Sequence, residues 1–191
     1  MAVLLRAVRE SDAAALANIY SYYATQTVVT FTTEPPTEQD YIEKIRHLTP
    51  MYPFLVLEEN GALLGFAYAD RMRPHDAYLW DVELTIYLSP SAPKHIGLGS
   101  QLLGALLRVL SHQGFTSAYS VITFPNPPSI GLHQAFGFTE VGHFPKAGFK
   151  QGRWLDIMWL HKALGDFPAQ PKPPLPFSQL SAAALQKLLQ I

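Results

Sequence analysis

The sequence predicts an α/β protein in which a mixed sheet of about seven strands is flanked by helices. Two patterns in the central stretch indicate this class. Between Trp80 and Leu88 apolar and polar residues alternate, as in a strand, and after Gly99 the apolar residues recur with the period of a helix that buries one face. Segments of both kinds alternate along the 191 residues, of which 48% are hydrophobic, so one domain can bury a sizeable core.

The first predicted elements are a strand over residues 3–8 and a helix over 13–22. Ser11 or Asp12 precedes this helix, and either side chain could accept hydrogen bonds from the free N–H groups of its first turn. Residues 25–33 are rich in β-branched side chains, and a pair of prolines ends whatever structure they form.

A second helix and a β-hairpin follow. Thr37 and Asp40 are spaced as in a capping box, with aspartate in the usual place of glutamate, and predict a helix that runs to about His47. Two apolar runs flank Asn60-Gly61, a pair that supplies the positive φ angles of a tight hairpin turn. The strands of this predicted hairpin are residues 54–57 and 63–69.

The turn between the predicted strand 78–88 and the central helix contains Gly97 and Gly99. The N-terminus of a helix has unpaired N–H groups and a partial positive charge, and residues without a Cβ let an anion approach closely, so this turn is a candidate phosphate site. It is not a P-loop, because no lysine stands between Gly99 and Ser100, and a dinucleotide fingerprint would require glycine instead of Leu102.

Three strands and a short helix are predicted beyond the central helix. In chain order they are strand 117–124, helix 129–136, strand 138–141 and strand 153–160. Residues 145–152 contain proline and glycine and are predicted to form a loop that covers one end of the sheet.

A tail of different composition ends the chain. Five of the ten residues from Phe167 to Pro176 are proline, which predicts an extended segment outside the core. Residues 181–189 can form a small amphipathic helix. The tail either packs as a strap on its own domain, the interpretation that we favour, or binds a partner.

The composition excludes several classes of function. The net charge of −1 gives no basic field for nucleic acid, so no such partner is expected. The chain has no cysteine and its seven histidines are scattered, so neither thiolate catalysis nor a metal site is expected. No apolar run suits a signal peptide or a membrane span, and the expected location is the cytoplasm, without a membrane partner.

The order of elements and several motifs together resemble the GNAT superfamily of acyl-CoA-dependent N-acetyltransferases, and most closely the phosphinothricin and methionine sulfone or sulfoximine N-acetyltransferases. The motifs are Thr33-Glu34-Pro35, Tyr78-x-Trp80-x-Val82-Glu83-x-Thr85-x-Tyr87, Gly97-Leu98-Gly99-Ser100, Pro125-Asn126-x-Pro128-Ser129, His133-x-Ala135-x-Gly137-Phe138 and Ala147-Gly148-Phe149-Lys150-x-Gly152-x-Trp154-x-Asp156. The resemblance implies a GNAT domain over residues 3–165, with a splay between the fourth and fifth strands, and a proline-rich extension over 166–191.

The resemblance also implies which residues contact coenzyme A. The backbone of the fourth strand would pair with the pantetheine chain, with the N–H of Leu88 as donor to the thioester carbonyl oxygen. The implied contacts are Ile86, Tyr87, Leu88, Lys94, His95, Ile96, Gly97, Leu98, Gly99, Ser100 and Asn126. Lys94 stands where the family has glutamine or arginine, and Pro93 before it removes one backbone donor.

Two residues are implied in catalysis. Glu83 is the candidate general base, because acetyl transfer requires the neutral amine whereas an α-ammonium is largely protonated at neutral pH. The alternative for Glu83 is an exposed glutamate on an edge strand. His133 matches a histidine near the active site of phosphinothricin-type members, although a buried structural histidine fits as well. Many GNAT enzymes protonate the thiolate with a tyrosine where this chain has Phe136, so that acid is unidentified.

The acceptor is expected to be a small amine that resembles an amino acid. The family uses basic residues at the positions of Arg73 and His75, with Tyr78, to hold it, unless these residues form only a solvated loop. The predicted function is therefore transfer of the acetyl group of acetyl-CoA to such an amine, without a metal. Members of the family are commonly dimers, so the resemblance also implies a homodimer. The alternatives are acetylation of a peptide or protein amine, and a non-catalytic acyl-CoA-binding module.

Overall fold

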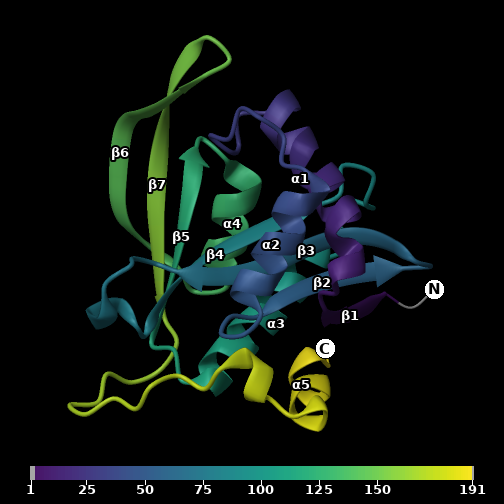
Figure 1. Ribbon diagram of the computed structural model, residues 1–191. Coiled ribbons are helices and arrows are strands. Elements are labelled where there is room, and N and C mark those ends of the chain that lie inside the picture. The colour runs from purple at the N-terminus through teal and green to yellow at the C-terminus, as the bar shows by residue number, and fades with distance from the viewer. Residues whose placement is uncertain (1–2, 191) are drawn as a thin grey trace.

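Residues 3–190, which the computed structural model describes, fold around a seven-stranded sheet with the order β1-β2-β3-β4-β5-β7-β6 (Figure 1). The strands are β1 (Leu4–Ala7), β2 (Phe54–Glu59), β3 (Ala62–Arg71), β4 (Asp81–Leu88), β5 (Ser117–Phe124), β6 (Thr139–Lys150) and β7 (Arg153–Ala163). The helices are α1 (Ala13–Gln26), α2 (Glu38–Leu48), α3 (Leu98–Gln113), α4 (Pro127–Ala135) and α5 (Ala182–Leu189). This mixed sheet with flanking helices confirms the predicted fold class.

The sheet splays between β4 and β5, as predicted. These strands are parallel and pair only from Asp81–Glu83 to Ser117–Tyr119, whereas every other neighbouring pair is antiparallel. Beyond Glu83, β4 continues along β3 as far as Leu88, and β5 continues along β7 as far as Phe124. A wedge therefore opens between two halves of one sheet.

Two hydrophobic clusters cover the faces of the sheet, because alternate residues of β2 and β3 point to opposite sides. α1 and α2 pack on the face that carries Phe54, Val56 and Phe66. α3 packs on the face that carries Leu55 and Ala67, and ten of its sixteen residues are buried. The helices thus lie on both sides of the sheet and leave the wedge open at one end (Figure 1).

Local sequence signals gave the correct element ends in two places. Thr37 and Asp40 form the predicted capping box: the Asp40 N–H donates to Thr37 Oγ1 at 3.2 Å, and the Thr37 N–H donates to Asp40 Oδ2 at 2.7 Å. Asn60 and Gly61 have φ angles of 52° and 81°, as the hairpin turn requires. Both signals act within four residues, so distant parts of the chain do not override them.

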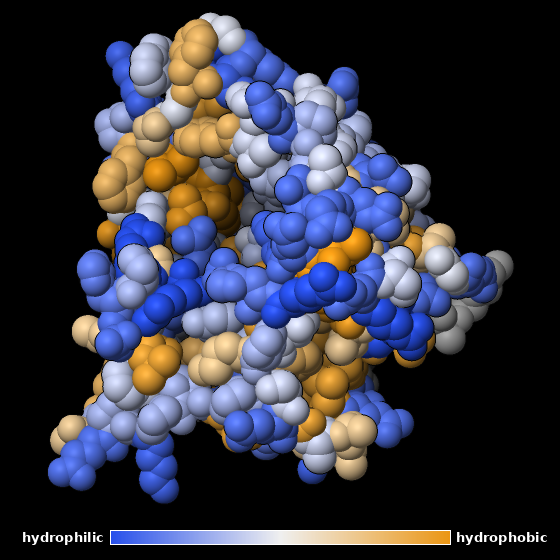
Figure 2. Space-filling model, viewed as in Figure 1, coloured by the Kyte–Doolittle hydropathy of each residue, from blue (hydrophilic) through white to orange (hydrophobic). Residues whose placement is uncertain are grey.

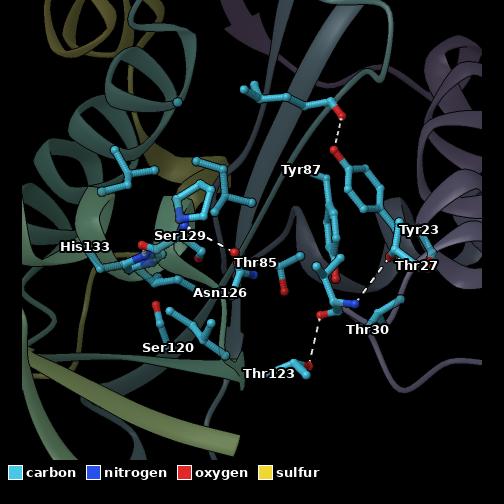
Figure 3. A pocket seen from close by; sticks show the side chains of 18 of the residues that line it. Tyr23, Thr27, Thr30, Thr85, Tyr87, Ser120, Thr123, Asn126, Ser129 and His133 are labelled. Carbon is cyan, nitrogen blue, oxygen red and sulfur yellow. Dashed lines mark hydrogen bonds between the residues drawn. The ribbon is translucent and has the colours of Figure 1, made fainter. Parts of the chain in front are cut away.

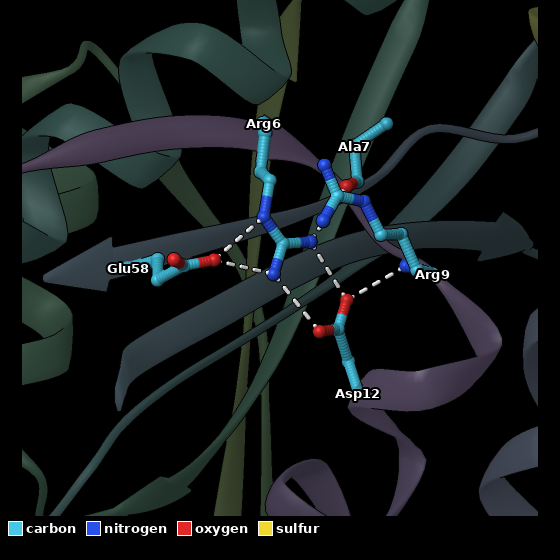
Figure 4. Close-up of polar contacts among 5 residues, drawn as sticks. All are labelled: Arg6, Ala7, Arg9, Asp12 and Glu58. Carbon is cyan, nitrogen blue, oxygen red and sulfur yellow. Dashed lines mark hydrogen bonds and ion pairs between the residues drawn. The ribbon is translucent and has the colours of Figure 1, made fainter. Parts of the chain in front are cut away.

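The predicted side-chain cap of α1 is wrong. Asp12 lies directly before the helix, but its carboxylate accepts two hydrogen bonds from the Arg6 guanidinium, at 2.8 and 2.9 Å, and one from the Arg9 N–H at 2.7 Å (Figure 4). Glu58 of β2 binds the same guanidinium at 2.6 Å. The side chain of Arg6, a residue of β1, is largely buried, and the two carboxylates compensate its positive charge.

The predicted loop over residues 145–152 is also wrong. β6 continues to Lys150, and Gln151-Gly152 alone form the turn to β7. The register shifts between Phe144 and Gly148, and Pro145 falls in this irregular stretch of an edge strand, where no ladder hydrogen bond is lost. The result is a long hairpin that rises beside the wedge (Figure 1).

The proline-rich tail packs along the domain. The Leu175 N–H donates to the Gln113 carbonyl oxygen at 2.7 Å, and the Gln113 side chain donates to the carbonyl oxygens of Leu175 and Met51, at 2.7 and 2.9 Å. Phe177 is buried, and α5 packs against α3, where Arg108 binds the helix end. The tail thus packs on its own domain, as the strap interpretation expects. The last residue of the predicted extension, Ile191, lies outside the described residues.

Candidate active site

A cavity of about 1000 Å³ fills the wedge between β4 and β5. Its walls come from β4, the turn before α3, the end of β5, α4, and α1 with the segment that follows it. In the space-filling view the surface is hollowed beside the β6–β7 hairpin, and hydrophobic side chains gather at this hollow (Figure 2). Such a volume holds an extended ligand together with a second, smaller one.

Glu83 lies at the narrow end of the wedge and lines the cavity. Its side chain is partly buried, and no donor among the described residues forms a hydrogen bond to its carboxylate. Burial raises the pKa of Glu83, the positive charge of Arg73 opposes this shift, and the negative charge of Asp70, its register partner on β3, adds to it. A carboxylate with a raised pKa suits proton abstraction near neutral pH.

Beyond Glu83, β4 has no partner strand on the side that faces β5. Ile86, Tyr87 and Leu88 line the cavity there, so backbone groups of this free edge can pair with an extended ligand. The Leu88 carbonyl oxygen already accepts a hydrogen bond from the Tyr23 hydroxyl at 2.7 Å.

The turn before α3 closes the wide end of the cavity. Gly97 has a φ of 82° and precedes the first helical residue, Leu98. The residues of the first turn line the cavity, namely Gly97, Leu98, Gly99 and Ser100, with Lys94 and His95 beside them. Ile96, the remaining predicted contact in this turn, is 55% exposed and does not line the cavity. Free N–H groups at the N-terminus of a helix are the chemistry that can bind an anion such as a phosphate.

Asn126 and His133 belong to α4 and its start. The Asn126 side chain accepts the Ser129 N–H at 3.4 Å and caps the helix, while the residue also lines the cavity. His133 is 2% exposed, and its Nδ1 lies 2.8 Å from the Ser129 carbonyl oxygen, so Nδ1 carries the proton. Its Nε2 has no partner among the described residues, and burial lowers the pKa of His133. The ring is therefore neutral and offers a lone pair.

None of the three predicted acceptor contacts lines the cavity. The Arg73 guanidinium lies 5.1 Å from the centre of the Trp159 ring and acts on Glu83 through its charge. His75 precedes the short 3₁₀ turn Asp76–Tyr78 before β4 and Tyr78 ends it, and both side chains are exposed. A smaller cavity of about 170 Å³ adjoins Glu83 and is lined by Tyr68, Asp70, Arg71, Glu83 and Thr85. The role of the three residues in acceptor binding stays a prediction.

The sequence interpretation missed the polar wall opposite α4. Tyr20 and Tyr23 of α1 and Thr27 and Thr30 of the following segment line the cavity together with Tyr87 (Figure 3). The Tyr20 hydroxyl lies 2.7 Å from Thr30 Oγ1, and its ring packs edge-on against that of Tyr87. Tyrosines one helical turn apart were the available signal, but this spacing is also that of an ordinary buried face.

Two classes of site are not found among residues 3–190. No group of three histidine, aspartate or glutamate side chains there could hold a metal ion. None of the helices in this part of the chain has both the length and the apolar composition to cross a lipid bilayer.

Comparisons with known proteins agree with this geometry. Residues 5–159 match the family model of the acetyltransferase (GNAT) domain. The chain is 39% identical over 178 residues to phosphinothricin N-acetyltransferase of Streptomyces viridochromogenes, which covers 93% of this chain and 96% of that protein. It is 32% identical over 168 residues to L-methionine sulfoximine/L-methionine sulfone acetyltransferase of Salmonella typhimurium, which covers 86% and 96%, respectively.

A solved structure is similar over nearly the whole length. It is a GNAT superfamily phosphinothricin acetyltransferase from Sinorhizobium meliloti in complex with acetyl-CoA, with a TM-score of 0.85 and 36% sequence identity. The superposition covers 90% of this chain and 94% of that chain.

Proposed function

Because this chain belongs to the GNAT acetyltransferase family, we propose that it transfers the acetyl group of acetyl-CoA to the primary amine of a small acceptor that resembles an amino acid. The observation that carries this function is the position of Glu83, a carboxylate with a raised pKa in a cavity that the free edge of β4 and the N-terminus of α3 both border. The named relatives suggest acceptors of the phosphinothricin, methionine sulfone or methionine sulfoximine type.

The described residues suit acetyl-CoA as the co-substrate. The N–H groups of Leu98, Gly99 and Ser100 would bind the pyrophosphate, with the charge of Lys94 nearby. The free backbone edge from Ile86 to Leu88 would pair with the pantetheine chain, and the Leu88 N–H would donate to the thioester carbonyl oxygen. Asn126, at the opposite wall, would add a side-chain contact.

In the proposed reaction the residues of the chain mainly position the reactants and move one proton. The carboxylate of Glu83 removes a proton from the acceptor ammonium, directly or through water, and the neutral amine attacks the thioester carbonyl carbon. A C–N bond forms, the C–S bond breaks, and the thiolate of coenzyme A leaves. The nitrogen loses its second proton as the amide forms, and this proton passes to the thiolate directly or through water. The raised pKa of Glu83 makes the first step easier at neutral pH.

We propose that His133 does not supply the proton that the thiolate needs. Its Nδ1–H is directed at the Ser129 carbonyl oxygen, and Nε2 is unprotonated because burial lowers the pKa of the ring. We therefore propose that His133 acts as a hydrogen-bond acceptor toward a bound ligand. In this proposal the thiolate receives the second proton of the acceptor nitrogen, directly or through water.

The experiment that tests this function is a transfer assay that detects free thiol. The protein is mixed with acetyl-CoA and with methionine sulfone, methionine sulfoximine, phosphinothricin or a peptide with a free N-terminus. Thiol release that depends on one of the small amino acids is the expected result. Release with the peptide alone would instead support a peptide acetyltransferase, and tight acetyl-CoA binding without release for any amine would support a binding module.

We further propose that the active form is a cytoplasmic homodimer built from residues 3–165, with 166–191 as a strap. Large apolar side chains are exposed on the β6–β7 hairpin, namely Val141, Phe144, Phe149 and Trp154, each between 51% and 61% exposed. This patch lies on the edge strand of the sheet and its neighbour, where a second copy could cover it (Figure 2). The co-substrate, made inside the cell, supports the cytoplasm as location.

A further inference from the structure

Lys150, the last residue of β6, is a buried lysine that the proposed reaction does not use. It is 6% exposed, and its ammonium donates to the carbonyl oxygens of Thr30 and Thr32, at 2.8 Å each, and of Tyr23 at 3.4 Å. No carboxylate among residues 3–190 forms an ion pair with it. Burial lowers the pKa of Lys150, and backbone carbonyl dipoles are what stabilise its charge.

The carbonyls belong to the end of α1 and to the segment from Thr27 to Thr32, here called the bridging segment. It forms no helix or strand, and Thr27, Val29, Thr30 and Phe31 of this segment line the large cavity. A segment without regular backbone pairing depends on side chains to hold it in place. The position of this part of the cavity wall therefore depends on the side-chain contacts of the bridging segment.

The half of the sheet that contains β5, β6 and β7 supplies most of these contacts. Besides Lys150, Thr123 of β5 donates to the Val29 carbonyl oxygen at 3.2 Å, and the Gln151 side chain donates to Thr27 at 3.4 Å. The Phe31 ring lies directly on Gly148, where any side chain would overlap it. This side thus fixes the bridging segment by hydrogen bonds and by a close backbone approach.

The other half of the sheet holds the same segment through α1. The Tyr20 hydroxyl lies 2.7 and 2.8 Å from the hydroxyls of Thr30 and Thr32, and the Tyr20 ring packs against Tyr87 of β4. Tyr23, the third residue bound by Lys150, donates to the Leu88 carbonyl oxygen. The bridging segment therefore connects the two halves across the open end of the wedge, where β4 and β5 no longer pair (Figure 3).

We propose that Lys150 is a positioning residue that ties the bridging segment to the β6–β7 hairpin and so sets the wall of the cavity against which the acceptor binds. This proposal rests on the proposed function. The proposed coenzyme contacts lie on other elements, namely the turn before α3, the start of α4 and the free edge of β4, which the β3 ladder holds in place. Loss of the ammonium should thus disturb the acceptor more than coenzyme A.

The test compares Lys150→Met, which keeps the unbranched chain except for its terminal atom and removes the charge and the donors, with Lys146→Met, which changes an exposed lysine of the same strand. Three quantities are measured on the full chain: amide hydrogen exchange in residues 27–32, the Kd of coenzyme A by calorimetry, and kcat and KM for the acceptor. In Lys150→Met we expect faster exchange in residues 27–32 and a decrease of about tenfold or more in acceptor kcat/KM, mostly through KM. The Kd of coenzyme A should stay within about threefold, because its contacts remain. Lys146→Met should match the wild type.

Thr123→Val provides a second variant if Lys150→Met does not fold. It removes one donor to the same segment, and we expect the same changes with a smaller magnitude. Wild-type exchange in residues 27–32 of both variants would overturn the tie itself. Faster exchange with an unchanged acceptor KM would overturn the positioning role. If the wild type transferred no acetyl group, the proposed function would fail, while the exchange measurement would still decide whether the tie exists.

Discussion

Glu83 lies between two opposite charges, and the balance between them bears on its proposed role as a base. Asp70 faces it across the β3–β4 ladder and raises its pKa, whereas Arg73 reaches it from the loop after β3 and lowers its pKa. Asp70 lies outside all the motifs that resemble the family, so the sequence alone does not indicate its effect on Glu83. The structure shows the relation because antiparallel register places the two carboxylates side by side.

The pH dependence should reveal this balance. If Glu83 is the base, acceptor kcat/KM decreases as the pH falls through its pKa, because the carboxylate becomes protonated. Asp70→Asn removes the charge that raises this pKa and should move the acidic limb to lower pH, whereas Arg73→Ala should move it to higher pH. Profiles of kcat/KM with methionine sulfone measure both shifts, and limbs that moved in the same direction would exclude Glu83 as the titrating group.

Replacement of Glu83 itself should separate catalysis from stability. Glu83→Gln should lower kcat by about 10²–10⁴-fold near neutral pH and leave the Kd of coenzyme A almost unchanged. A carboxyl group whose folded pKa is raised destabilises the fold when ionised, so the variant should be the more stable protein at neutral pH. This advantage should disappear as the pH falls below the unfolded pKa, where both states of the wild type are protonated. Thermal unfolding at several pH values and single-turnover kinetics check the two parts independently.

Among the elements, the N-terminus of α3 has the most direct link to binding. Gly99 lies in its first turn, and a Cβ there would come within 3.2 Å of the Leu132 side chain of α4. Gly99→Val should therefore push α4 away and crowd the anion site, and weaken coenzyme A binding by about tenfold or more. Gly131→Ala is a suitable control, since nothing lies near its Cβ position on α4. Calorimetry that gave wild-type affinity for Gly99→Val would remove this turn from the binding site.

The elements also show where prediction from the sequence works and where it does not. The capping box of α2 and the Asn60-Gly61 turn were predicted correctly, because both depend on residues within one turn of chain. The strand character of residues 145–150 was missed, because only pairing with β7 makes an extended strand of a segment with proline and glycine. The predicted helix cap by Asp12 failed for a related reason. Asp12 binds Arg6, which is held in place by Glu58, more than fifty residues away.

The same distinction applies to the site. Motifs in the sequence led to Glu83, the turn before α3 and Asn126, all of which line one cavity in the structure. The bonds from Lys150 to Thr30 and Thr32 join positions 120 and 118 residues apart, and no local pattern signals them. The family motif around Lys150 was visible, but its function as a tie could only come from the folded structure.

At the scale of the whole molecule, the exposed hairpin predicts the oligomeric state. A charge placed in the apolar patch would be costly to bury, so Trp154→Glu should convert a homodimer to a monomer. Light scattering coupled to gel filtration measures the mass directly. Arg153→Glu, which changes an exposed neighbour outside the apolar set, serves as the control. A monomeric wild type at micromolar concentration would contradict the proposed dimer.

Within the sheet, the meeting point of β4 and β5 has the geometry of a pivot. The two halves of the sheet share only three paired positions, of which Glu83 is the last, and Leu88 lies about 17 Å farther along β4 at ordinary strand rise. A rotation of one half by a single degree would thus displace Leu88 by ~0.3 Å, by simple lever geometry from that rise, and barely move Glu83. The width of the wedge is therefore most sensitive to such a rotation near Leu88, where the bridging segment and Tyr23 brace the two halves, and least sensitive at Glu83.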